Sequence, residues 1–439
     1  MKIKEIPGSV VAPKGFLASG VFCDIKKLGT GKGSDKGPKR DLALIVSEVP
    51  ATVAGLFTTN QICAAPVKVC EAHIRKAGAR AIVANSGNAN ACTGKQGLRD
   101  AKAMAETAGC ELNIAVENIF VASTGRIGLA MPMENVRCGI LEAVKALGNS
   151  ADHAGHAAEA IMTSDTRPKQ IAVEFVLGGK TVRIGGICKG AGMIQPGMSP
   201  NGKRPAVQSL HATMLCFITT DAAVDAKVLQ AALNEAVAHS FNRITVDGDM
   251  STNDTVLVLA NGLAGNEKFK LNSPAFKIFQ TALNHVCLEL AKMMVRDGEG
   301  VHRIVTVRVT GAKTIADADA AARAVGNSSL VKTSWHGGDP NWGRIMGAIG
   351  YAPAIIVEEK VDIGYSAPES HDILWSLKRG QPTSATFKEL CAVVAPKEFD
   401  LHIRLNLGKA GAVIYATDLT EDYVSFNKGD VADPASLGG

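Results

Sequence analysis

Short apolar runs of β-type composition alternate with helical patterns along most of this chain, and this alternation restricts the fold more than any other feature. Helical periodicity is clear over residues 134–147, 226–240 and 276–294, and in the last of these the apolar residues recur at three- and four-residue steps as one buried stripe. The runs that read as strands are 41–48, 80–84, 118–123, 170–177, 181–187, 212–220, 254–260 and 302–309. The alternation is too irregular for a repeated βαβ barrel, so it predicts a layered α+β architecture.

Size and composition are those of an ordinary globular protein. The 439 residues are too many for one small core, and 46% are hydrophobic and 20% charged, which predicts two or three packed units. The 45 glycines and the 5% of aromatic residues favour tight turns in a sheet-rich enzyme. The net charge of +5 is mild, and no stretch gathers basic and aromatic residues, so nucleic-acid binding is disfavoured.

The cysteines and the N-terminus indicate a reduced, cytoplasmic protein. The ten cysteines are scattered without a CxxC pair, which argues against a disulfide framework. The opening MKIKEIPGSVVAPKG has charges and prolines where a signal peptide needs an apolar run. No window approaches the roughly 18 consecutive apolar residues of a membrane span. We therefore expect no membrane association.

Several stretches invite a cofactor or metal interpretation that the residues do not support. The glycines of the loop at 29–41 match neither GxGxxG nor the P-loop. The stretch VDGDMSTNDT (246–255) has Thr252 and Val258 where a calcium-binding EF-hand loop needs Gly and Glu. Asp152, His153 and His156 share a helical face near a helix start, where polar residues usually face solvent. We expect no metal and no organic cofactor.

The densest cluster of unusual residues is KGAGMIQPGM (189–198), followed after a polar loop by HATMLCFITTDA (211–222). It places a lysine on a Gly-rich turn and Thr213 at the start of an apolar strand. A threonine hydroxyl is a poor nucleophile unless a base lies beside it. Cleavage of the preceding peptide bond would free the α-amino group of the threonine, whose ordinary pKa of about 8 suits it to accept the hydroxyl proton.

These two segments carry a resemblance to a known family. Lys189–Met198 and Ala212–Leu215 resemble the KGxGMIxPxMATML signature of the ornithine acetyltransferases, also called the bifunctional glutamate N-acetyltransferase or ArgJ family, of arginine biosynthesis. The likeness continues along almost the whole chain in VVAPKGFLASGV, DLALIVSEVPATVAGLFTTN, VANSGNANACTG, ASTGRIG, IMTSDTRPK, FNRITVDGDMSTNDT, VRDGEG and GDPNWGRIMGAIGYA.

The resemblance implies roles for particular residues. It makes Thr213 the nucleophile, released when the Ala212–Thr213 bond breaks into an α chain (1–212) and a β chain (213–439). It makes Thr124 and Gly125 the oxyanion hole, with one hydroxyl and one backbone N–H. The positions that match substrate contacts are Thr163, Lys189, Glu299 and Asn427. A further C-terminal contact, a Thr or Ser in the family, falls on Ala432 here.

One departure lies beside the nucleophile. The family joins PxM directly to AT, whereas thirteen residues, 199–211, intervene here. We expect cleavage to survive, because the entropic cost of a loop grows slowly with its length and a cut loop becomes a free end. The resemblance also makes residues 246–255 a loop that supports the active site by satisfying buried backbone groups.

The fold and function that follow are an αββα sandwich of the self-processing kind and a ping-pong acetyl transfer from N2-acetyl-L-ornithine to L-glutamate. Family members are typically heterotetramers of two α and two β chains, and some also accept acetyl-CoA, which the sequence leaves open. Three alternatives stay open: a related amidase or aminopeptidase that hydrolyses the acyl-enzyme, an uncleaved relative that only binds acetylated amino acids, and a structural or nucleic-acid-binding protein.

Overall fold

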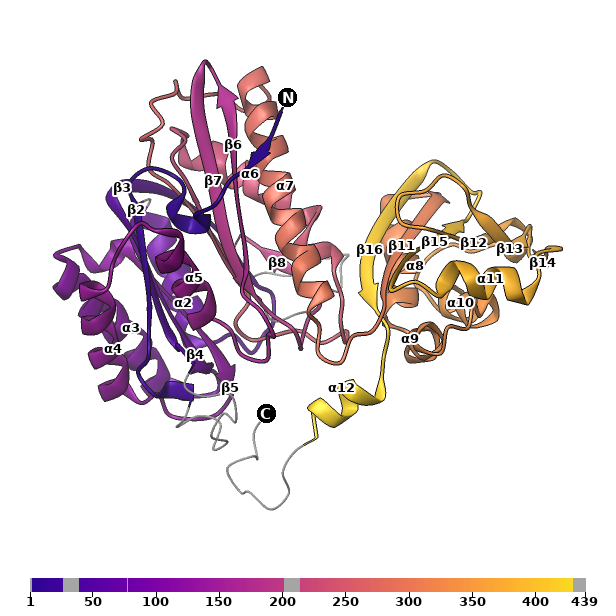
Figure 1. The fold of residues 1–439 in the computed structure, drawn as a ribbon, viewed down its shortest axis with the longest axis horizontal. Helices are drawn as coiled ribbons and strands as arrows, with labels where there is room; N and C mark the ends of the chain where they lie inside the picture. Colours follow the sequence, from indigo (N-terminus) through magenta and orange to yellow (C-terminus); the bar gives the residue numbers. More distant parts are fainter. Residues whose placement is uncertain (1, 27–38, 77, 201–213, 429–439) are drawn as a thin grey trace.

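The computed structural model describes residues 2–26, 39–76, 78–200 and 214–428. Two β-sheets organise these residues into a larger and a smaller part, joined near the end of a long helix (Figure 1). Residues 212, 213 and 432, and most of the loops at 29–41 and 199–211, lie outside the described residues. None of the helices within these ranges is both long and apolar enough to cross a bilayer.

The larger part is built on a ten-stranded sheet with the order β1-β6-β7-β9-β10-β3-β4-β5, in which β2 and β8 also pair with β3. Its strands are β1 (Lys4–Glu5), β2 (Phe16–Val21), β3 (Leu42–Thr58), β4 (Ala79–Asn88), β5 (Ile119–Arg126), β6 (Lys169–Leu177), β7 (Lys180–Lys189), β8 (Met198–Ser199), β9 (Leu215–Thr220) and β10 (Thr255–Ala260). Its helices are α2 (Ala65–His73), α3 (Gly94–Leu112), α4 (Met133–Lys145), α5 (Ala151–Ala160), α6 (Ala226–Ala238) and α7 (Pro274–Arg296).

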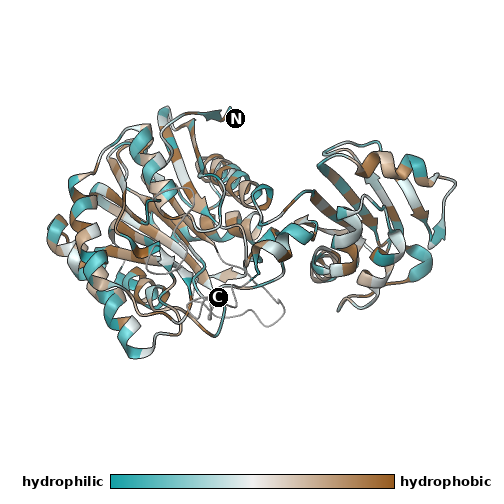
Figure 2. Cartoon of the chain, turned by 60° about the horizontal axis from the view of Figure 1, so that its bottom comes forward, coloured by the Kyte–Doolittle hydropathy of each residue, from teal (hydrophilic) through white to brown (hydrophobic). Residues whose placement is uncertain are grey.

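The layers of this part follow from the alternation of strand side chains between two faces. Leu215 and Phe217 of β9 lie in a core shared with strands β2–β5 and helices α2–α5. Cys216 and Ile218, which point the other way, lie in a second core with α6 and α7. Figure 2 shows hydrophobic residues along the strands between the helices and hydrophilic residues on outward helix faces. The predicted layered α+β class is confirmed.

Strand β3 is longer than predicted because it serves both halves of this sheet. Its first half pairs with β2 and β4, and its second half pairs with β10. The sequence predicts an end at residue 48, before Pro50, but Pro50 falls at the register shift between Val46 and Ala51, where a missing N–H costs no regular ladder bond.

The smaller part has a six-stranded sheet of order β14-β13-β12-β15-β11-β16 around a third core. Its strands are β11 (Ile304–Ala312), β12 (Asp362–Ser366), β13 (Leu374–Lys378), β14 (Gln381–Pro382), β15 (Glu398–Arg404) and β16 (Ala410–Thr417). Its helices are α8 (Ile315–Asn327), α9 (Ser329–His336), α10 (Trp342–Gly350) and α11 (Phe387–Val394). After β16 the chain returns towards the larger part through α12 (Glu421–Phe426), as Figure 1 shows.

Candidate active site

Thr124 and Gly125 lie at the end of β5, beside the end of the parallel strand β4. Gly125 has φ +127°, and a Cβ there would lie 2.4 Å from the carbonyl carbon of Gly87, so no side chain fits without a backbone shift. Thr124 is buried at 2% exposure. The end of β5 therefore holds a buried hydroxyl next to a glycine whose backbone lies directly against β4.

Lys189 ends β7 and reaches this strand end from the other half of the sheet. Its Nζ donates a hydrogen bond to Thr124 Oγ1 over 3.2 Å, and the side chain is buried. Burial lowers the pKa of Lys189, whereas the carboxylates of Asp165 and Glu299 act in the opposite direction. The structure thus brings together two of the residues that the family resemblance selects, Thr124 and Lys189.

The start of β9 is fixed next to this pair. Leu215 is the antiparallel partner of Lys189 on one side and the parallel partner of Thr255 on the other. Met214 is fully buried, its N–H donates to the Asp254 carboxylate, and its carbonyl accepts from Thr255 N over 3.0 Å. Residue 213 is covalently bonded to this Met214 nitrogen, so its attachment point lies at the site even though Thr213 is outside the described residues.

Asp254 is a buried carboxyl group that residue patterns did not single out. Oδ1 accepts the Met214 N–H, and Oδ2 has no hydrogen-bond partner among the described residues. Burial raises the pKa of Asp254 well above its usual range, although the Met214 N–H and Lys189 oppose this. Asp247, in the same loop, accepts from the N–H groups of Met193 (2.6 Å) and Ile194 (2.8 Å). The predicted role of residues 246–255 in satisfying buried backbone groups is confirmed at both aspartates.

Glu299 and Asn427 also meet, although the smaller part of the molecule separates them in sequence. Asn427 Nδ2 donates to Glu299 Oε2 over 3.0 Å, and Ser164 supplies a further hydrogen bond to the same carboxylate. The carboxylate packs against Gly192, where a Cβ would lie 2.4 Å from it. Burial raises the pKa of Glu299, and the hydrogen bonds from Ser164 and Asn427 partly offset the rise.

A buried charge network lies behind Lys189. Lys169 Nζ is paired with Asp165 and with Asp297, the latter over 2.5 Å, and all three side chains are almost fully buried. Asp165 also accepts from Gly190 N over 2.7 Å, next to Lys189, and from Thr163 N over 3.0 Å. The predicted substrate residue Thr163 thus contacts this network through its backbone, and it is the adjacent Ser164 that reaches Glu299.

Asp165, Lys169, Asp297 and Ser164 were not predicted. The signal available for Ser164, Asp165 and Asp297 was the concentration of polar residues in MTSDT and RDGEG, whereas Lys169 lies outside both segments. The arrangement as a whole holds a cation, a hydroxyl, a glycine backbone and a carboxylate around the start of one strand. Such a set can bind a small zwitterion and stabilise an oxyanion.

Comparison with known proteins gives a consistent family. The ArgJ family profile matches residues 19–429. The arginine biosynthesis bifunctional protein ArgJ of Symbiobacterium thermophilum is 46% identical over 422 residues, which cover 96% of this chain and 98% of the relative. The glutamate N-acetyltransferase of Methanocaldococcus jannaschii is 44% identical over 432 residues, covering 97% of this chain and 99% of the relative.

Two solved structures match part of this chain. The ornithine acetyltransferase of Mycobacterium tuberculosis, solved with ornithine, is 35% identical, with a TM-score of 0.41, over 45% of this chain and all of that one. The ArgJ protein of Bacillus halodurans is 37% identical, with a TM-score of 0.42, over 45% of this chain and 98% of that one.

Proposed function

The chain belongs to the ArgJ family, and we propose that it transfers the acetyl group of N2-acetyl-L-ornithine to L-glutamate through an acetyl ester on Thr213. The products are L-ornithine and N-acetyl-L-glutamate, in arginine biosynthesis. The observation that carries the proposal is the 3.2 Å contact between Lys189 Nζ and Thr124 Oγ1, made by a lysine whose strand partner, Leu215, lies two residues beyond Thr213.

The first step is self-cleavage of the Ala212–Thr213 bond, which converts 439 residues into chains of 212 and 227. The freed α-amino group of Thr213 then serves as the base for its own hydroxyl, because its ordinary pKa of about 8 is close to neutral pH. The hydrogen bonds on both sides of Met214 support this step, since they fix the residue to which Thr213 is attached on its C-terminal side.

Acetyl transfer then proceeds in two half-reactions. Thr213 Oγ attacks the acetyl carbonyl carbon while its proton passes to the α-amino group, and the oxygen of the tetrahedral intermediate accepts from the Thr124 hydroxyl and Gly125 N–H. The C–N bond breaks, and the proton goes to the nitrogen of the departing ornithine. The amine of glutamate next attacks the ester carbonyl, and its proton returns to restore Thr213. The positive charge of Lys189 beside Thr124 favours the oxyanion.

The charges at the site suit the two amino-acid substrates. Lys189 supplies a cation for a carboxylate, and Glu299, held by Asn427 and Ser164, supplies an anion for the side-chain amine of ornithine. Ala432, where the family has a Thr or Ser, lies outside the described residues. The family resemblance further supports a cytoplasmic heterotetramer of two α and two β chains.

A denaturing gel with N-terminal sequencing of the purified wild type and of Thr213→Ala tests the cleavage. We expect two nearly equal fragments from the wild type, one of them beginning Thr-Met-Leu-Cys, and a single full-length band from Thr213→Ala. A wild type that stays uncut while it transfers acetyl groups would contradict the proposal.

A further inference from the structure

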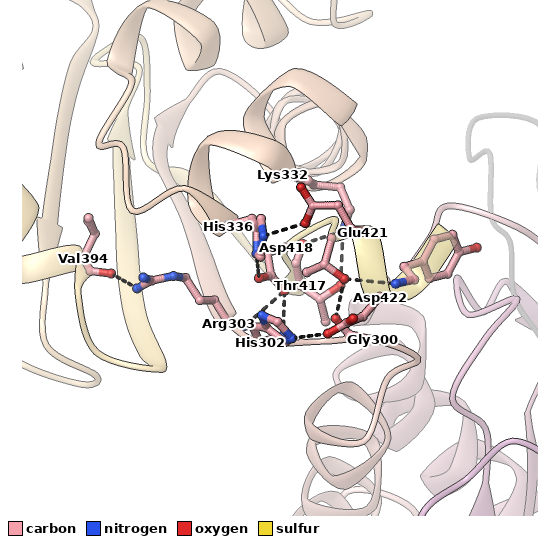
Figure 3. Close-up of polar contacts among 12 residues, drawn as sticks. Gly300, His302, Arg303, Lys332, His336, Val394, Thr417, Asp418, Glu421 and Asp422 are labelled. Atoms are coloured by element: carbon pink, nitrogen blue, oxygen red, sulfur yellow. Dashed lines mark hydrogen bonds and ion pairs between the residues drawn. The ribbon is translucent and has the colours of Figure 1, made fainter. Parts of the chain in front are cut away.

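A second cluster of titratable side chains lies where the two parts of the molecule meet, outside the site described above. His302 precedes β11, His336 ends α9, and Asp418 follows β16. Each of these residues offers one ligand atom, and the three atoms lie within 4.8 Å of one another. Figure 3 shows the two imidazole rings gathered around Asp418, while Arg303 points away towards Val394.

Asp418 is anchored by one carboxylate oxygen and leaves the other without a hydrogen bond. Its Oδ1 accepts from the backbone N–H groups of His302 and Arg303, each over 3.0 Å. The side chain is fully buried, and its Oδ2 has no hydrogen-bond partner among the described residues. This oxygen lies 3.4 Å from Nδ1 of His336, which likewise has no hydrogen-bond partner there. The two atoms form an ion pair when Nδ1 of His336 is protonated, whereas a neutral ring with a bare Nδ1 leaves two adjacent buried acceptors that a shared cation would satisfy.

In each imidazole ring, Nε2 is bonded to a carboxylate oxygen. Nε2 of His336 lies 3.0 Å from Glu421 Oε2, and Nε2 of His302 lies 2.7 Å from Asp422 Oδ2. A carboxylate that binds one ring nitrogen fixes the tautomer and raises the basicity of the other, which is the usual surrounding of a metal-bound histidine. Glu421 and Asp422 are consecutive residues at the start of α12, so one helix end supplies this support to both rings.

We propose that His302, His336 and Asp418 bind a divalent transition-metal ion, with Zn²⁺ as the best-suited ion. Two imidazoles and one carboxylate match the borderline character of Zn²⁺ and leave a fourth position for water or substrate. Tetrahedral zinc with ligands at about 2.0–2.1 Å spaces neighbouring ligand atoms about 3.3 Å apart, close to the separation of His336 Nδ1 from Asp418 Oδ2. Three carboxylates, from Asp418, Glu421 and Asp422, surround the two rings, while the Nζ of nearby Lys332 is bonded to Thr417.

The ion would connect this junction to the acetyl-transfer site. Asp418 and the first residues of α12 lie at one end of a short segment whose other end is Asn427, which donates to Glu299. His302 follows Glu299 by only three residues. Zinc bound between His302, His336 and Asp418 would therefore fix α12 against α9 and hold Asn427 in place at Glu299.

The test uses the full-length protein after removal of metals with a chelator, titrated with Zn²⁺ alone in a calorimeter. We expect one zinc ion per chain to bind, and its affinity to fall at least tenfold in His302→Gln and in His336→Gln. The matched control is His285→Gln, which changes a half-exposed histidine on α7 that lies 3.7 Å from Glu5. Free thiols are zinc ligands and Cys92, Cys110 and Cys138 are exposed, so only the difference between the variants and the wild type is compared.

Circular dichroism in the presence of chelator shows whether each variant is folded, and hydrogen exchange reports on α12. Zinc should slow amide exchange over residues 420–427 in the wild type and leave it unchanged in His336→Gln. An identical zinc isotherm for the wild type and for the folded His302→Gln and His336→Gln proteins would overturn the proposal, as would a loss of zinc in His285→Gln.

Discussion

Thr124 and Lys189 are 65 positions apart in sequence, yet their side chains share a hydrogen bond. Gly125, which follows Thr124, lies against the backbone of Gly87 where β4 and β5 end together. At the residue scale, the site is thus a hydroxyl and an ammonium group held at fixed positions by two strand ends. Preorganised donors of this kind are among the largest contributions to catalysis.

Thr124→Val removes the hydroxyl and keeps the β-branched shape. We expect kcat for acetyl transfer to fall about 10²- to 10³-fold, as for the loss of one oxyanion-hole donor. The measurement is steady-state kinetics with N2-acetyl-L-ornithine and L-glutamate on protein whose cleavage has been checked on a gel. Thr306→Val, on β11 of the other sheet, is the matched control. A kcat within twofold of the wild type would remove Thr124 from the oxyanion hole.

The site residues that the sequence predicts lie in family-like motifs, whereas those that it does not predict are brought together only by the fold. Thr124, Lys189, Glu299 and Asn427 stand in motifs that resemble those of the family, so their numbers could be given before their positions in space were known. Lys169 and Asp297 pair across 128 positions, and no periodicity or spacing connects them. A lysine and an aspartate taken singly read as solvent-exposed residues, and only the fold shows that they are buried partners.

Long periodic segments and apolar runs in the sequence predict the helices and strands of the larger part well. The predicted helix 276–294 is α7, which extends to Pro274–Arg296 because Ser273 caps it and Pro274 occupies its first turn. The strands after residue 312 were not predicted. Short strands such as LWSLK (374–378) alternate weakly and carry charges, so their composition does not distinguish them from loops.

The network of Asp165, Lys169 and Asp297 joins the first residue of β6 to the C-cap of α7. Burial raises the pKa of Asp165, but Lys189 and Lys169 outweigh it and lower the pKa from 3.8 to about 2. A carboxyl group whose folded pKa is depressed stabilises the fold above its unfolded pKa of about 3.9, and this stability is lost as the pH falls towards the folded value.

We therefore expect Asp165→Asn to lower the free energy of unfolding by about 3 kcal/mol at pH 7, because Lys169 keeps only one partner. About 2 kcal/mol of the difference should disappear between pH 4 and pH 2, since only the wild type loses the ionised carboxylate. Urea unfolding at several pH values measures both effects, with the exposed Asp152→Asn as the control. If the difference in the free energy of unfolding between the wild type and Asp165→Asn stays constant down to pH 2, the pKa of Asp165 is not depressed.

At the scale of the whole molecule, the two parts are linked by charges as well as by the chain. Arg243, in the larger part, pairs with Asp319 of α8, which also accepts from Arg323 Nε over 2.9 Å. Arg323 in turn donates to the carbonyl of Asn242 over 2.7 Å. These side chains are largely buried, so the junction is a specific contact rather than a flexible linker.

Asp319→Ala should lower the free energy of unfolding by about 3–5 kcal/mol, because it leaves two buried guanidinium groups without their carboxylate. Lys268→Ala, which breaks the exposed pair with Asp225, should cost less than about 1 kcal/mol. Thermal or chemical unfolding of both variants tests the difference. If both substitutions lower the free energy of unfolding equally, the ion pairs at the junction contribute no more to stability than a surface ion pair.

The proposed reaction requires that Thr213 carry the acetyl group between the two substrates. Mass spectrometry of the separated chains, after incubation with N2-acetyl-L-ornithine and no glutamate, tests this directly. We predict one added acetyl group on Thr213 at the start of the 227-residue chain, and its loss when L-glutamate is added, with N-acetyl-L-glutamate as the product. Acetyl transfer that proceeds at full rate while residue 213 is never acetylated, or in the Thr213→Ala protein, would contradict it.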